Sequence, residues 1–155
     1  MGKRYYLAYG SNLNVQQMRY RCPSARVIGT GMLEGYRLMF KGSLSGSYLT
    51  VEPFSGGSVP VVAWEVSAAD EAALDHYEGF PRFYYKRDMK QVIKSIRNGK
   101  AKALDVFLYV MQDDRKYGVP SQRYVNVCRQ GYAAFGFDQR ILTKALNASA
   151  MEVYL

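Results

Sequence analysis

The stretch Tyr5-Tyr6-Leu7-Ala8-Tyr9-Gly10-Ser11-Asn12-Leu13 predicts a strand that leads through a tight loop into the start of a helix. Its first five residues have the length and aromatic content of a buried β-strand. Gly10 permits backbone angles that other residues resist, and Ser11, Asn12 or Asn14 can cap the following helix. Free N–H groups at a helix start favour a carboxylate or phosphate. The corner is therefore a candidate anion site, although turn chemistry alone also explains its residues.

The composition is that of one globular domain over residues 1–155. With 48% hydrophobic and 14% aromatic residues, the chain can bury a sizeable core, which excludes disorder. No apolar run approaches the ~20 residues that a membrane-spanning helix needs, and no signal-peptide core is recognisable. We therefore expect a cytoplasmic protein without membrane contacts, and the sequence leaves its oligomeric state open.

The net charge of +8 allows attraction to nucleic acid or to small anions and selects neither. Many of the lysines and arginines are spread over residues 86–102, within a predicted hairpin. Alternating basic residues on a hairpin are more typical of a solvated face than of a binding groove. Nucleic acid is therefore not an expected partner.

Residues 15–66 predict one short helix followed by strands. The helix covers Val15–Arg21 and ends before Pro23, because the residue preceding a proline is disfavoured in the α region. The strand-like segments are Ala25–Leu33, Gly35–Lys41, Tyr48–Glu52 and Val59–Val66. Turn-forming residues at 53–57 separate the last two segments and predict a hairpin between them.

The second half of the chain predicts helices around one long hairpin. Ser67 is a good helix cap, and Gly79 followed by Pro81 ends this helix at Tyr77 or Glu78. Asn98-Gly99 is the strongest signal for a type I′ turn, here between strands 83–96 and 101–111. Two more helices are expected over residues 121–135, capped by Ser121, and from Asp138 to about residue 148. Early strands with short connections and few, late helices predict an α+β fold with a mixed or closed sheet.

Few residues suit the common catalytic arrangements. His76 is the only histidine and directly follows Asp75 on a predicted helix, so their side chains diverge and a Ser-His-Asp triad is not expected. Cys22 and Cys128 lack partners at metal-ligand spacing, so the sequence supports no metal site. Both cysteines are expected to be reduced, and the sequence does not show whether they meet in space.

Glu78 differs from the other carboxylates of the chain. It closes a predicted helix, where a carboxylate meets the negative end of the helix dipole, and Tyr77, Phe80 and Phe83 surround it in sequence. If its side chain points into these aromatic residues, desolvation raises its pKa and makes it a usable general base near neutrality. The alternative is a charged residue on an exposed surface.

These motifs together resemble the γ-glutamylcyclotransferase-like family, which includes the AIG2-like proteins. The similarity spans nearly the whole chain, and the order and spacing of the motifs are more specific than any single match. The matching segments are the Tyr-Gly-Ser-Asn-Leu loop (Tyr9 to Leu13), Pro23-Ser24-Ala25, Gly35 to Leu38, Trp64-Glu65-Val66, the Leu-Asp-x-x-Glu-Gly helix end (Leu74 to Gly79) and the Pro-Ser-x-x-Tyr helix start (Pro120 to Tyr124).

The resemblance implies a compact mixed β-barrel of five to seven strands flanked by a few helices. It also implies an enzyme without cofactor or metal, acting on a small γ-glutamyl amino acid or γ-glutamylamine. The substrate's own α-amine attacks its γ-carbonyl, which yields 5-oxoproline and a free amine. On this reading Glu78 is the general acid/base. The residues implied in substrate binding are Tyr9, Gly10, Ser11, Asn12, Leu13, Tyr84 and Tyr124.

Two points stay open on the sequence alone. If the strand register is shifted by one residue, Tyr85 takes the place of Tyr84, because neighbouring strand residues face opposite ways; core packing also explains these tyrosines. The amine half of the substrate is undetermined, since fold does not fix substrate. The second hypothesis is a catalytically silent module of the same fold that binds a small molecule with the same loop.

Overall fold

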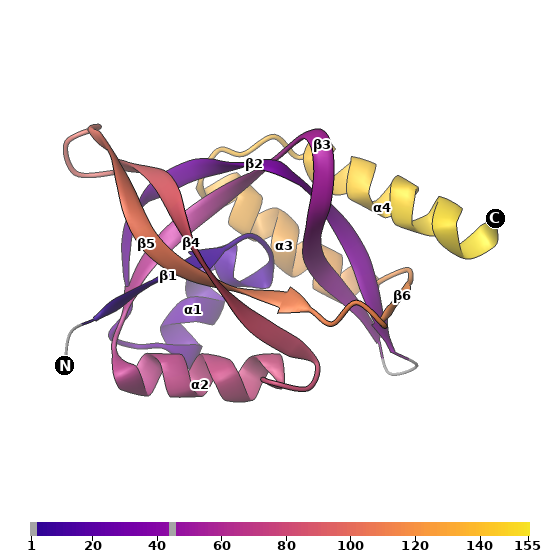
Figure 1. The fold of residues 1–155 in the computed structure, drawn as a ribbon, viewed down its shortest axis with the longest axis horizontal. Coiled ribbons are helices and arrows are strands. Elements are labelled where there is room, and N and C mark those ends of the chain that lie inside the picture. Colours follow the sequence, from indigo (N-terminus) through magenta and orange to yellow (C-terminus); the bar gives the residue numbers. More distant parts are fainter. Residues whose placement is uncertain (1–2, 44–45) are drawn as a thin grey trace.

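The computed structural model describes residues 3–43 and 46–155, and residues 1–2 and 44–45 lie outside this description. Five strands close into a barrel in the order β3-β1-β5-β4-β2, because β2 also pairs with β3 (Figure 1). A sixth strand, β6, extends the sheet at β2. The β1–β5 pair is parallel and the other pairs are antiparallel, so the predicted α+β fold with a closed mixed barrel is confirmed.

The elements follow one another with short connections. The strands are β1 (Arg4–Ala8), β2 (Arg26–Ser43), β3 (Gly46–Val66), β4 (Tyr84–Ser95), β5 (Ala101–Met111) and β6 (Lys116–Tyr117). The helices are the 3₁₀ turn η1 (Ser11–Leu13), α1 (Val15–Arg21), α2 (Ala68–Glu78), α3 (Gln122–Ala134) and α4 (Arg140–Tyr154). None of the helices in the described part of the chain is long and apolar enough to cross a membrane.

The two longest strands differ from the prediction. Apart from Ala25, the predicted strands Ala25–Leu33 and Gly35–Lys41 belong to the single strand β2, and the segments on either side of residues 53–57 belong to the single strand β3. The two halves of β3 do not pair with each other. Each pairs instead with one half of β2, so the predicted hairpin around residues 53–57 is wrong.

The turn-forming residues bend these strands and do not reverse them. The β2–β3 register shifts between Glu34 and Tyr36, where Gly35 has φ 82°. Gly56, on the facing strand, has φ 81°. Left-handed angles of this kind accompany bulges that bend a strand while its pairing continues. Because β2 offers a partner along its whole length, pairing with it replaces a local turn.

The hairpin of β4 and β5 is confirmed, but its turn is longer than predicted. The Ser95 N–H donates to the Lys100 carbonyl at 2.9 Å, which leaves a loop of residues 96–99. Within that loop only Gly99 has a positive φ, at 70°, whereas a type I′ turn needs two such residues. Asn98 instead accepts from the Lys100 N–H through its side chain at 2.9 Å. The type I′ prediction is therefore wrong.

The predicted helix caps are largely confirmed. Ser67 and Asp70 form a capping box at the start of α2, and Gly79, with φ 64°, ends this helix directly after Glu78. Ser121 caps α3. The last helix begins at Arg140, after the N-cap Gln139 and not at Asp138, and it runs to Tyr154, beyond the predicted end. On its buried face the Ser149 hydroxyl accepts from the Phe40 N–H at 2.8 Å.

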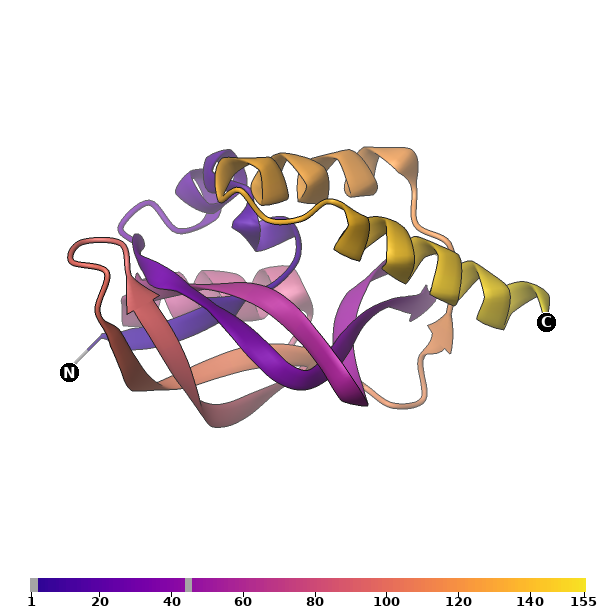
Figure 2. The same ribbon diagram turned by 90° about the horizontal axis from the view of Figure 1, so that it is seen from above.

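Helix α3 lies directly on the loop between β1 and α1. Figure 2 shows α3 alongside η1 and α1. The contact requires a glycine, since a Cβ at Gly131 would lie 2.7 Å from the backbone carbon of Leu13 and 2.8 Å from the nitrogen of Asn14. The loop is therefore held between the barrel and α3.

Gly131→Ala is expected to destabilise the protein. In an ordinary helix this change adds about 1 kcal/mol of stability through helix propensity, but here the added methyl group collides with backbone atoms of the loop. Urea unfolding measures the effect. The control is Ala133→Gly on the exposed side of α3, which loses about 1 kcal/mol by propensity alone; an increase in stability for Gly131→Ala would contradict the packing described.

Candidate active site

One cavity of about 380 Å³ opens beside the carboxyl end of α2, between this helix and the barrel. Half of the residues that line it are aromatic. The lining residues are Tyr6, Tyr9, Gly10, Ser11, Asn12, Ser43, Tyr48, Leu49, His76, Tyr77, Glu78, Gly79, Phe83, Tyr84, Tyr109 and Tyr124. The structure thus brings the Gly-Ser-Asn loop and the end of α2 together, although about 65 residues separate them in sequence.

Glu78 is the acidic side chain of this lining. Gly79 ends α2 immediately after it, and the half-buried Glu78 lines the cavity. Burial raises the pKa of the Glu78 carboxyl to about 8, and the positive charge of Arg21 partly opposes this rise. A carboxyl group that titrates near neutrality can both take up and return a proton.

Asn12 connects the loop to Glu78. The residue is 2% exposed, and its amide nitrogen donates to the Tyr6 hydroxyl at 2.9 Å and to Glu78 Oε1 at 3.5 Å. The carbonyl oxygen of the same amide accepts from Arg21 Nη1 at 2.5 Å. Every hydrogen-bonding group of this side chain is thereby used. Arg21 escaped the sequence reasoning because a basic residue in the last turn of a helix is already explained by the helix dipole.

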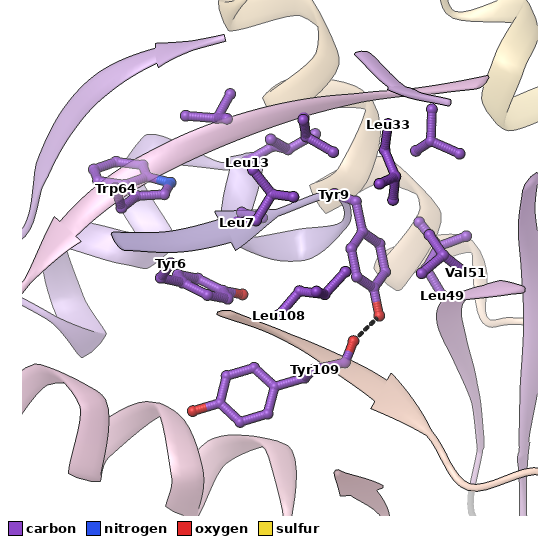
Figure 3. Packing of buried hydrophobic residues seen from close by; sticks show 14 of the residues in the cluster. Tyr6, Leu7, Tyr9, Leu13, Leu33, Leu49, Val51, Trp64, Leu108 and Tyr109 are labelled. Carbon is purple, nitrogen blue, oxygen red and sulfur yellow. Dashed lines mark hydrogen bonds between the residues drawn. The ribbon is translucent and has the colours of Figure 1, made fainter. Parts of the chain in front are cut away.

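The remaining loop residues take different positions. Ser11 lines the cavity, with its hydroxyl 3.4 Å from that of Tyr77. The capping role falls to Asn14, whose side chain accepts from the Gln17 N–H at 3.1 Å. Leu13 is fully buried in the hydrophobic core and does not line the cavity, as Figure 3 shows with its core neighbours. Leu13 therefore anchors the loop from behind.

Tyrosines fix the cavity wall. The Tyr84 hydroxyl donates to the Leu49 carbonyl at 2.7 Å, and the Tyr124 hydroxyl accepts from the Leu49 N–H at 3.2 Å. Tyr9 donates to the Tyr109 carbonyl at 2.5 Å (Figure 3). Burial is the largest cause that raises the pKa of each of these four tyrosines, so they stay neutral at physiological pH.

The register of β4 answers the question left open between the two neighbouring tyrosines. Tyr84 is buried and lines the cavity, whereas Tyr85 is partly exposed, packs against the core and does not line it. Tyr109 is a wall residue that sequence reasoning missed. Its hydroxyl donates to Asp75 Oδ1 at 2.6 Å, and Asp75 pairs with Lys86 at 2.8 Å. A tyrosine inside an apolar strand gave no signal beyond core packing.

The cysteines do not line the cavity. Cys22 and Cys128 are buried and both are free thiols. Burial raises their pKa values, to about 11 for Cys22 and about 12 for Cys128, so neither is a thiolate near neutrality. Within residues 3–43 and 46–155 there is no group of three or more His, Cys, Asp and Glu side chains that could hold a metal ion.

Comparison with known proteins agrees with this geometry. The sequence model of the family described as "Gamma-glutamyl cyclotransferase, AIG2-like" matches residues 6–126. The chain therefore belongs to the γ-glutamyl cyclotransferase, AIG2-like family. That match includes the loop, Glu78, Tyr84 and Tyr124.

Individual relatives fit the same assignment. The chain is 27% identical over 146 residues to a mouse γ-glutamylcyclotransferase, covering 90% of this chain and 75% of the mouse protein. A solved structure named γ-glutamyl cyclotransferase superposes with a TM-score of 0.75 at 24% identity, over 92% of this chain and 86% of that one. A human protein solved as uncharacterised gives 0.76 at 24% identity, over 94% and 87%. These two structures share the fold.

Tyr84→Phe is expected to lower the free energy of unfolding by about 1–2 kcal/mol, because it leaves the buried Leu49 carbonyl without its donor. Tyr85→Phe is the matched control on the adjacent position of β4. Its hydroxyl has no hydrogen-bond partner among the described residues, so a change below about 0.5 kcal/mol is expected. Urea unfolding of both variants provides the comparison, and equal losses would contradict the strand register.

Proposed function

We propose that this chain is a γ-glutamylcyclotransferase that converts the γ-glutamyl group of a small substrate to 5-oxoproline and releases a free amine. The observation that carries the proposal is the Glu78 carboxyl group, which faces the cavity opposite the Gly-Ser-Asn loop with its pKa raised to about 8. The family match and the mouse relative support the same type of reaction.

Proton transfer by Glu78 accounts for the chemical step. The substrate's α-amine, whose ordinary pKa is about 8, attacks the γ-carbonyl carbon, and a carbon–nitrogen bond forms to close a five-membered ring. Glu78 takes the proton that the attacking nitrogen loses. It then gives this proton to the leaving nitrogen as the original amide bond breaks. The balance of the reaction contains no oxidant, reductant or cofactor.

The loop supplies the binding half of the proposal. Within the loop, the N–H groups of Leu13 and Asn14 bond to the carbonyls of Gly10 and Ser11 at 3.0 Å. Ser11 and Asn12, whose N–H groups precede them, line the cavity, and we assign these N–H groups as donors to the α-carboxylate or the developing oxyanion. The aromatic wall at Tyr9, Tyr84 and Tyr124 would hold the carbon chain of the glutamyl group.

A rigid cavity suits this reaction because ring closure is intramolecular. The enzyme has to fix one conformer of a flexible chain and manage two proton transfers. The hydroxyl groups of Tyr84 and Tyr124 bind the same backbone residue, Leu49, on β3, so this wall is defined before a substrate arrives. We propose γ-glutamyl amino acids and γ-glutamylamines as the substrate class.

The test measures 5-oxoproline release from a panel of γ-glutamyl amino acids and γ-glutamylamines, for the parent protein and Glu78→Gln. The substitution keeps the size of the side chain and removes its ability to exchange a proton, so turnover is expected to fall by about 100-fold or more. Glu152→Gln, on the exposed face of α4, is the matched control and should leave turnover unchanged.

Two results would contradict the proposal in different ways. A Glu78→Gln variant as active as the parent would remove Glu78 from the mechanism. A parent protein that releases no 5-oxoproline from any panel member, while members of the panel raise its melting temperature, would instead indicate the silent binding module of the same fold.

A further inference from the structure

The guanidinium group of Arg21 contacts the loop, its own helix α1 and the helix α2 that carries Glu78. Its Nη1 donates to Asn12 Oδ1 at 2.5 Å on the loop, and its Nη2 donates to Gln17 Oε1 at 2.8 Å on its own helix. Its Cζ also lies over the ring of Tyr77 on α2, 3.4 Å from the ring centroid. Arg21 does not itself line the cavity.

The bond from Arg21 decides which end of the Asn12 amide faces Glu78. A guanidinium group is a donor only, so it fixes the carbonyl oxygen of Asn12 toward α1. The amide nitrogen must then point the other way, where it donates to Tyr6 and Glu78. With the amide turned around, its carbonyl oxygen would face the Glu78 carboxylate, which would lose this donor, and its NH₂ group would face the guanidinium group, which cannot accept.

We propose that Arg21 is a positioning residue of the active site, which acts through Asn12 to hold the Glu78 carboxyl group in the orientation that proton transfer requires. The proposal rests on the function assigned above. Arg21 also contacts the ring of Tyr77, the residue before Glu78, and this contact restricts the backbone from which the Glu78 side chain extends. The positive charge of Arg21 also lowers the pKa of Glu78 and so favours the ionised form that takes up a proton.

The hydrogen bond between Asn12 and Glu78, which Arg21 is proposed to position, is a long one. Asn12 lies 3.5 Å from Glu78 Oε1, close to the limit of a hydrogen bond. Hydrogen bonds of this kind tighten when a substrate fills the site. Small errors in the placement of such a group are costly, since a misplacement of about 1 Å can reduce turnover by about 100-fold. Loss of Arg21 is therefore expected to act on kcat more than on KM.

The first experiment compares Arg21→Met with Arg19→Met by 5-oxoproline release. Arg19 lies in the last turn of the same short helix, is exposed and does not line the cavity, so its replacement removes a positive charge from the same helix end without touching the site. We expect Arg21→Met to lower kcat by about 10- to 100-fold with KM changed less than about threefold. Arg19→Met should match the parent. Equal kcat values for the two variants would overturn the proposal.

A double-mutant cycle separates positioning from general support of the fold. If Arg21 acts through Asn12, then Arg21→Met combined with Asn12→Ala has a kcat within about twofold of Asn12→Ala alone. Losses that multiply would show that Arg21 acts independently of Asn12 and would overturn the proposal. Arg21→Lys keeps the charge but cannot provide two parallel donors and a flat stacking surface; full recovery of kcat by this variant would likewise contradict it.

A readout without turnover keeps this inference separate from the proposed function. In the parent protein, the side-chain amide protons of Asn12 are expected to shift in NMR spectra as Glu78 titrates, because the two groups are in contact. In Arg21→Met at least half of this shift should be lost, and an unchanged shift would overturn the proposal. If the parent releases no 5-oxoproline, the proposed function fails, and the NMR comparison still decides the role of Arg21.

Discussion

The removal of one carboxyl group from water is the constraint on which the site depends. Glu78 ends α2 facing a tyrosine-lined cavity, and burial there raises its pKa to about 8 from an ordinary value near 4.5. Between these two values the folded protein retains a proton that the unfolded chain has released. Glu78 is therefore compatible with full stability below about pH 4.5, and it reduces stability increasingly as the pH rises to about 8. This loss of stability accompanies a proton acceptor that works near neutrality.

The rest of the structure fixes the surroundings of that group. At its start, α2 is closed by the Ser67–Asp70 capping box. Along its length it is tied to β4 by Lys86, which bonds to Glu71 at 2.6 Å and to Asp75 at 2.8 Å. Opposite Glu78, the loop is held between the barrel and α3, where Gly131 leaves no room for a side chain. Both sides of the cavity are thus supported from outside it.

Local signals predicted much of this arrangement. The sequence indicated the first strand, the caps at Ser67 and Ser121, and the end of α2 at Glu78, because each depends on residues adjacent in the chain. The long strands β2 and β3 were not predicted as such, since glycine-rich bends read as turns when the facing strand is not known. The type I′ turn failed for a related reason: a dipeptide signal does not show where pairing of the flanking strands stops.

The site was predicted to a similar extent. Residues in recognisable motifs, the loop and Glu78, line one cavity as a resemblance to the family implied. Arg21 and Tyr109 could not be found this way. Arg21 contacts Tyr77 and Tyr109 contacts Asp75 across elements that are far apart in sequence, and both residue types have ordinary explanations in a helix end and a core strand. Leu13 shows the converse case, since a residue inside the motif packs into the core.

The most direct test of the account is the pKa of Glu78 itself, measured by NMR titration of the protein labelled with ¹³C in its glutamate carboxyl groups. The Glu78 signal is assigned by its absence from the Glu78→Gln spectrum. The account predicts that this signal titrates with a pKa of about 8. A Glu78 carboxyl group that titrates near 4.5 would contradict the account, because the group would then be solvated and the cavity would not raise its pKa.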